Sequence, residues 1–127
     1  MLVFGGLPRP ACNQRLREIT ARKVVVDLLY RTHGVAVEFE GEQHQLDRRQ
    51  YTKDLDRYAL MRGAAVPYCQ VTNEKLQQPR RLVLEVHREL VARGYDGPAP
   101  VFGERWKTLF RSLRAAVGER DWPHAAS

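Results

Sequence analysis

The sequence predicts an α/β fold in which a small mixed sheet is flanked by helices, and two observations support this class. Segments with strand-like composition occur at residues 13–19, 22–30, 34–40 and 65–71. Segments with apolar residues at helical spacing occur at residues 47–62, 79–94 and 104–117. The order is therefore a three-strand meander, a helix, a fourth strand and two further helices.

Turn and cap residues support the limits of these elements. "RTHG" is typical of a turn, with Gly34 in its last position. Asp47 is a candidate N-cap and Gly63 a candidate stop for the first helix. Pro67 cannot donate a hydrogen bond, so the fourth strand is expected at an edge or a bulge.

Length and composition limit the class of protein. The 127 residues suit one domain, and 43% hydrophobic with 28% charged residues is typical of a soluble globular chain. No apolar run approaches a membrane helix, and "MLVFGGLPRP" lacks the basic start of a signal peptide. We therefore expect a cytoplasmic protein without membrane contact. Cys12 and Cys69 are far apart, which indicates neither a zinc site nor a disulfide framework.

The charge balance favours a polyanionic partner. Lys and Arg number 21 against 15 acidic residues, so the formal net charge is +6. Nucleic acid is the commonest partner of such a surface, although many basic proteins bind none. The charge agrees with DNA binding and does not establish it.

The hairpin around "RTHG" brings carboxylates together. With Thr32 and His33 at the centre of the turn, Asp27 lies directly across from Glu38, where paired Cβ atoms are about 5 Å apart. Glu40 shares the face of Glu38, because strand side chains alternate. The register predicts three carboxylates on one surface.

Directly opposed like charges are destabilising, and a divalent cation would offset this cost. Mg²⁺ prefers carboxylate oxygens together with water and phosphate oxygens. A site between Asp27 and Glu38 is therefore one interpretation. The alternative is that the two glutamates are solvated and that Asp27 pairs with a nearby cation, namely Arg22, Lys23 or Arg31.

These residues resemble a known nuclease signature. Asp27, followed eleven residues later by Glu38-Phe39-Glu40, is similar to the PD-(D/E)xK pattern. The run "EFEGEQH" resembles the E-x-D-G-x-x-H run of uncharacterised actinobacterial domains related to very-short-patch-repair endonucleases. The Arg- and Asp-rich helix and the strand ending at Thr72 continue the likeness, which covers roughly residues 7–93.

The resemblance implies a restriction-endonuclease-like fold and a domain organisation. Residues 1–97 would form the nuclease-like core with an N-terminal loop. Residues 98–127 would form a C-terminal amphipathic helix and tail packed on the same domain. Relatives carry a longer upstream region, so a standalone module, a partner-dependent one or the remnant of a longer gene are all compatible with this chain.

The resemblance also implies roles for the acidic run. Asp27, Glu38 and the Phe39 backbone carbonyl would hold Mg²⁺ or Mn²⁺. Glu40 stands where the superfamily has Lys and the narrower family usually has Asp. His44 matches the family histidine; with an ordinary pKa of about 6.5 it suits a general acid or base, or a phosphate contact. The alternative for His44 is a turn residue that bonds the backbone.

Two further groups of polar residues belong to the expected site. Gln70 lies where the family often has Arg, and it would orient water or phosphate unless it only bonds a neighbouring strand. Basic residues of the first helix would contact the DNA backbone, namely Arg48, Arg49, Lys53 and Arg57. The alternative is a solvated face, because Asp54 and Asp56 dilute the positive charge.

The expected function is a metal-dependent DNA endonuclease that hydrolyses phosphodiester bonds, in DNA repair or in defence against phage and other foreign DNA. Cutting both strands usually takes two active sites, so a homodimer is one expected assembly. The alternative is a catalytically inactive module that binds nucleic acid or a partner, for example one member of a toxin–antitoxin pair. The missing Lys at Glu40 is the reason for that alternative.

Overall fold

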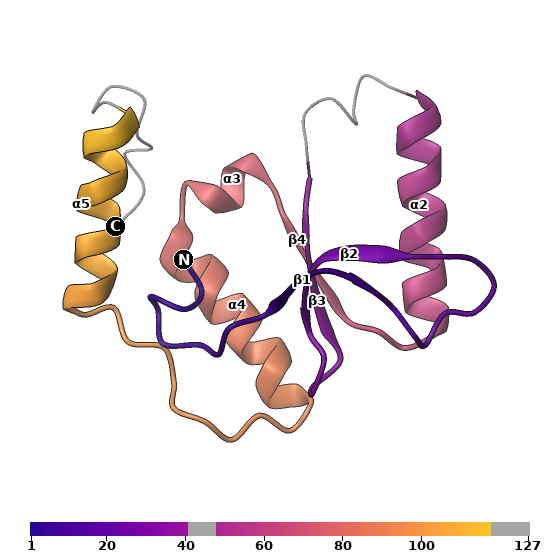
Figure 1. Ribbon diagram of the computed structural model, residues 1–127, viewed down its shortest axis with the longest axis horizontal. Coiled ribbons are helices and arrows are strands. Elements are labelled where there is room, and N and C mark those ends of the chain that lie inside the picture. Colours follow the sequence, from indigo (N-terminus) through magenta and orange to yellow (C-terminus); the bar gives the residue numbers. More distant parts are fainter. Residues whose placement is uncertain (41–47, 118–127) are drawn as a thin grey trace. The chain divides into compact units, whose positions relative to one another are not determined.

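The computed structural model describes residues 1–40 and 48–117. Its backbone divides into two compact units, one formed by residues 10–72 and the other by residues 1–9 with 73–127. Figure 1 shows their helices and strands along the chain. Each unit is described by itself, and the predicted packing of residues 98–127 on the sheet domain stays a prediction.

Unit 10–72 is built on a four-stranded mixed sheet, as the sequence predicts. The strand order is β1-β2-β3-β4, in which the first three strands are antiparallel neighbours and β4 runs parallel to β3. The strands are β1 (Ala11–Arg15), β2 (Val25–Tyr30), β3 (Val35–Phe39) and β4 (Tyr68–Val71). The three-strand meander followed by a helix and a fourth strand is confirmed at this level, which is a small α/β fold.

The turn between β2 and β3 has the predicted register. Leu28 pairs with Val37 and Tyr30 with Val35, so the same alignment places Asp27 opposite Glu38. The amide of Gly34 donates to the Tyr30 carbonyl at 2.7 Å, and Gly34 has a φ of 70°. Glycine takes this left-handed conformation without a Cβ clash, which explains its place at the end of the turn.

The limits of β1 and β4 differ from the prediction. The first strand was expected at residues 13–19 and lies at Ala11–Arg15, because the chain turns after Leu16, whose amide donates to the Val24 carbonyl. The fourth strand was expected from residue 65 and begins only at Tyr68. Ala65 has a φ of 56°, which is not an extended conformation, so it cannot belong to the strand. The placement of the Pro67 segment at an edge is confirmed, as β4 is an edge strand.

Helix α2 (Arg48–Gly63) covers one face of this sheet. The Tyr58 and Tyr68 rings stack with centroids 4.8 Å apart, which joins α2 to β4. The core of the unit consists of Leu16, Ile19, Val24, Val26, Leu29, Ala36, Tyr58, Met61 and Val66. The helix ends at Gly63 as predicted, and its candidate cap Asp47 lies outside the described residues.

The buried face of α2 differs from the apolar pattern of its sequence. Leu55 is 49% exposed, whereas Asp54, its neighbour, is only 8% exposed. Asp54, Tyr58 and Met61 lie at i, i+4 and i+7, so this partly polar stripe faces the sheet. The physical reason is that this face of the sheet carries polar as well as apolar side chains. Polar residues of the helix pack against the polar residues of the sheet.

The described residues of the second unit form the helices α3 (Asn73–Leu76), α4 (Pro79–Ala92) and α5 (Glu104–Val117). The predicted limits of α5 are confirmed, whereas α3 was not predicted. Gly94, with a φ of 98°, ends α4: its amide donates to the Val91 carbonyl, and the Tyr95 amide donates to the Leu90 carbonyl. In the residues that the structure describes, no helix is long and apolar enough to cross a membrane.

Substitution of a buried residue of α2 tests the orientation of this helix. Met61 is 0% exposed, so Met61→Ala should lower the free energy of unfolding by about 2–5 kcal/mol through lost burial and a cavity. Leu55→Ala, on the exposed side of the same helix, should change it by less than about 0.5 kcal/mol. Urea denaturation measures both. Equal losses in the two variants would contradict the orientation.

Candidate carboxylate site

Three neighbouring strands bring Asp27, Glu38 and Gln70 into one row. Glu38 of β3 pairs directly with Gln70 of β4, and Asp27 of β2 lies opposite Glu38 on the other side. Paired residues share a face of a sheet, so all three side chains project from the same face. This face carries Leu29 and Ala36, which pack in one core cluster with α2, so the row lies under the helix.

Glu38 is buried and ion-paired. Its side chain is 3% exposed, and its Oε1 accepts a hydrogen bond from Nη2 of Arg57, whose side chain is 24% exposed. The alternative in which Glu38 is solvated is therefore wrong, because α2 covers this position. The stack of Tyr58 on Tyr68 of the edge strand fixes the side of α2 that faces the sheet. Arg57, the residue before Tyr58, can therefore contact Glu38.

Burial raises the pKa of the Glu38 carboxyl from its ordinary value of 4.5 to about 7. Loss of hydration is the main cause, since it disfavours the charged form. The Arg57 guanidinium lowers the pKa, and the Asp27 carboxyl beside Glu38 raises it again. Asp27 and Glu38 therefore interact directly, and the Glu38 carboxyl takes up a proton near pH 7.

Arg57 stands at the centre of a small polar cluster. Its guanidinium lies 3.9 Å from the Asp54 carboxylate and 5.6 Å from the centroid of the Tyr58 ring. Burial lowers the pKa of Arg57, but Glu38, Tyr58 and Asp54 outweigh this effect and raise it, so the side chain stays charged. Its buried Nε has no hydrogen-bond acceptor among residues 1–40 and 48–117.

Asp27 is held by the backbone of the neighbouring strand. Its Oδ2 accepts a hydrogen bond of 2.8 Å from the Phe39 amide. The N–H and C=O groups of one strand residue point to the same neighbouring strand, so the Phe39 carbonyl is expected on the side of Asp27. Two of the three cations considered as partners of Asp27 bond elsewhere: Arg31 donates to Gln14 and to the Arg15 carbonyl, and Arg22 donates to the Lys53 carbonyl.

Gln70 is tied to α2 through a tyrosine. Burial raises the pKa of the Tyr58 hydroxyl above its ordinary value, and a hydrogen bond with the Gln70 side chain offsets part of this rise. The side chain of Gln70 is therefore oriented, and it lies beside Glu38 on the same face.

Of the remaining expected site residues, the structure describes the side chains of Glu40 and Lys53. Glu40 follows the end of β3 and is partly exposed; its amide donates to the Val71 carbonyl at 2.9 Å. Among the described residues, no three His, Cys, Asp or Glu side chains form a group that could hold a metal ion, so Glu40 does not complete a three-carboxylate cluster. His44 and the side chains of Arg48 and Arg49 lie outside the described part of the structure, while Lys53 is exposed.

Sequence analysis missed the helix residues that complete the site. Arg57 was expected to face DNA, and Asp54 and Tyr58 were given no part in the site. Their spacing of i, i+3 and i+4 places them on one side of a helix. That spacing was a usable signal, but it became meaningful only once the face of α2 that meets the sheet was known.

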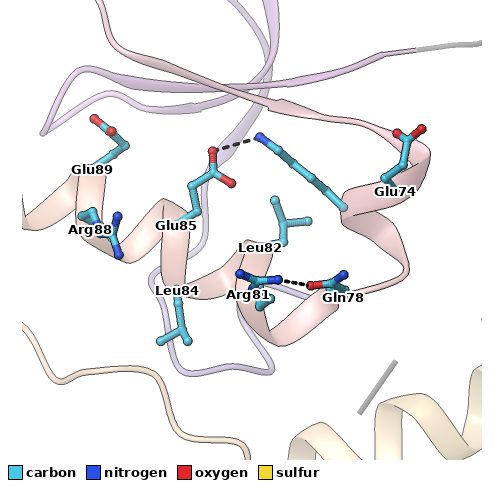
Figure 2. A pocket seen from close by; sticks show the side chains of 9 residues that line it. Glu74, Gln78, Arg81, Leu82, Leu84, Glu85, Arg88 and Glu89 are labelled. Carbon is cyan, nitrogen blue, oxygen red and sulfur yellow. Dashed lines mark hydrogen bonds and ion pairs between the residues drawn. The ribbon is translucent and has the colours of Figure 1, made fainter. Parts of the chain in front are cut away.

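The second unit carries a separate surface hollow of about 640 Å³ between α3 and α4. Figure 2 shows its lining, in which Lys75 is bonded to Glu85 at 3.0 Å and Arg81 to Gln78 at 2.6 Å. Three acidic and three basic side chains line it, namely Glu74, Glu85 and Glu89 with Lys75, Arg81 and Arg88. This balance favours neither an anion nor a cation, so the hollow is a weaker candidate than the carboxylate row.

Comparison of the chain with models of protein families, with curated proteins and with solved structures finds no match. Membership of the PD-(D/E)xK superfamily therefore stays a prediction from the motifs of the sequence. The functional interpretation below depends on the geometry of unit 10–72 together with those motifs.

The raised pKa of Glu38 predicts a dependence of stability on pH. A folded-state pKa near 7 against 4.5 when unfolded means that the folded state binds the proton more tightly. The stability from this group is thus full below about pH 4.5 and is lost as the pH rises to about 7. Urea denaturation from about pH 4 to 8 should show this fall in wild type and not in Glu38→Gln. The same slope in both proteins would contradict the assignment.

Proposed function

We propose that unit 10–72 is the catalytic body of a metal-dependent DNA endonuclease with a restriction-endonuclease-like fold. The observation that supports it best is the row formed by Asp27, Glu38 and Gln70 on adjacent strands, in which two carboxyl groups interact under a covering helix. Such a costly arrangement suggests a functional site, because perturbed carboxyl groups gather where charge is needed for chemistry.

The residues of the row fit Mg²⁺ or Mn²⁺. Asp27 and Glu38 would supply two carboxylates, and the Phe39 carbonyl, on the side of Asp27, would be a third oxygen ligand. One or two carboxylates with water and substrate phosphate is the usual magnesium site. When bound, the ion would polarise the phosphodiester and lower the pKa of water.

The other residues would position the reactants. Gln70, oriented by Tyr58, would hold a water or a phosphate oxygen beside Glu38. Glu40 replaces the lysine of the superfamily signature, and as an acceptor it would orient water or take its proton. His44 would donate to or accept a proton from the reacting oxygens, as general acid or base.

DNA contact would come from the basic residues of α2. Lys53 is exposed, and Arg48 and Arg49 belong to the first turn of the same helix. With a formal net charge of +6, the chain suits a phosphate backbone, and binding should weaken steeply as salt rises. Repair and defence against foreign DNA both require this chemistry.

A second function is supported by the ion pair between Arg57 and Glu38. The guanidinium already neutralises the carboxylate that a metal would need, and Glu40 stands in place of the lysine. A protein that keeps the fold but binds DNA or a partner protein without cleavage, such as one member of a toxin–antitoxin pair, would retain these features. Metal binding separates this candidate from the nuclease.

Cleavage of supercoiled plasmid DNA in Mg²⁺ or Mn²⁺ tests the nuclease. Asp27→Asn and Glu38→Gln remove one ligand charge each with little change of shape, so each should lower the nicking rate by at least about 100-fold, more than the loss typical of outer-shell partners. Asp56→Asn removes an exposed carboxylate of α2 and is the matched control, with an unchanged rate expected. Nicking that persists in the Asp27→Asn, Glu38→Gln double variant would refute the mechanism.

Thermal unfolding with Mn²⁺ decides between the two candidates. An ion that binds only the folded state stabilises it by about 2.7 kcal/mol at 100 times its dissociation constant. The nuclease predicts a Tm that rises with millimolar Mn²⁺ in wild type and not in the double variant. An unchanged Tm, with salt-sensitive DNA binding retained and no nicking, would favour the binding module.

A further inference from the structure

We propose that Arg57 is a switch that couples metal binding to DNA binding, by pairing with Glu38 in the free protein and with a DNA phosphate in the complex. This inference rests on the proposed function, because it concerns the regulation of the same carboxylate site. It differs from the sequence-based expectation, in which Arg57 only contacts DNA.

The first step is competition for one carboxylate. Arg57 donates to Oε1 of Glu38, whose side chain is 3% exposed. The guanidinium here takes the role that a metal ion would have, since its positive charge offsets the negative charge of Glu38 next to Asp27. A divalent ion bound to both carboxylates would repel the guanidinium, so the two cations exclude each other at Glu38.

The second step is that Arg57 is incompletely satisfied in the free protein. Its buried Nε–H has no acceptor among the described residues, and the Asp54 carboxylate is 3.9 Å from Nη1, too far for a hydrogen bond. A buried donor without an acceptor destabilises the state in which it occurs. A phosphate offers two oxygens to the fork of an arginine and would satisfy donors that Glu38 leaves free.

The third step is the position of Arg57 on α2. Lys53 lies one helical turn before it and is exposed, while the Arg57 side chain keeps 24% of its surface exposed. A phosphate bound beside Lys53 would thus lie within a helical turn of Arg57. The Arg57 side chain could then move, without a change of fold, from Glu38 to a phosphate beside Lys53. This movement would uncover Glu38.

Reciprocal coupling follows from these steps. DNA favours the state in which Arg57 has left Glu38, and a metal ion favours that same state. Each ligand should therefore tighten binding of the other by the same factor, which for coupled sites is about 5- to 150-fold. In the absence of DNA the site would bind a metal ion more weakly than it does in the complex with DNA.

Mn²⁺ binding to the full chain, measured by the electron paramagnetic resonance signal of free Mn²⁺, tests the switch. In wild type, a short duplex oligonucleotide should tighten Mn²⁺ binding at least about 5-fold. Arg57→Gln should bind Mn²⁺ about 10-fold more tightly without DNA, and its response to DNA should be lost. Arg62→Gln removes a charge from the last turn of the same helix without touching Glu38, and it should behave as wild type.

The outcomes separate the switch from the proposed function. Equal Mn²⁺ affinity in wild type and folded Arg57→Gln, or no effect of DNA on wild type, overturns the switch while the metal site stands. Absence of Mn²⁺ binding in wild type and in Arg57→Gln, with and without DNA, overturns the proposed metal site and the switch with it. If Arg57→Gln does not fold by circular dichroism, the wild-type coupling and Arg57→Lys, which keeps the charge and loses the fork, still decide the question.

Discussion

The buried ion pair between Glu38 and Arg57 is the interaction on which the rest of unit 10–72 depends. A carboxylate in the middle of a sheet loses its hydration, and its neighbour Asp27 adds repulsion. Arg57 offsets part of this cost, and it can do so only if α2 lies with its 54–57–58 side toward the sheet. The same orientation leaves Leu55 in solvent.

The site and the core therefore share one helix. Along α2, Met61 and Tyr58 bury apolar surface at the part of the sheet that carries Leu29 and Ala36, while Arg57 meets the polar row. The stack of Tyr58 on Tyr68 lies at the boundary between the two parts. A helix anchored by a packed core can thus hold a guanidinium beside a buried carboxylate.

Local features of the chain were sufficient to predict much of this unit. The turn that ends at Gly34 determines the hairpin register, because its length sets which residues of β2 and β3 lie opposite each other. Asp27 could thus be placed opposite Glu38 without a structure. The start of β4 was predicted less well. Ala65 has a left-handed φ, and such a conformation is expected from the sequence mainly at glycine.

The sequence by itself determined the α/β class, the hairpin and the pairing of Asp27 with Glu38, because turn chemistry and period-two alternation act between residues close in the chain. Only the tertiary structure decided that Gln70 completes the row, that α2 covers it and that Arg57 neutralises Glu38. The contacts of Glu38 with Arg57 and with Gln70 join residues 19 or more positions apart. They follow from how a helix rotates to bury both apolar and polar side chains, which no local pattern specifies.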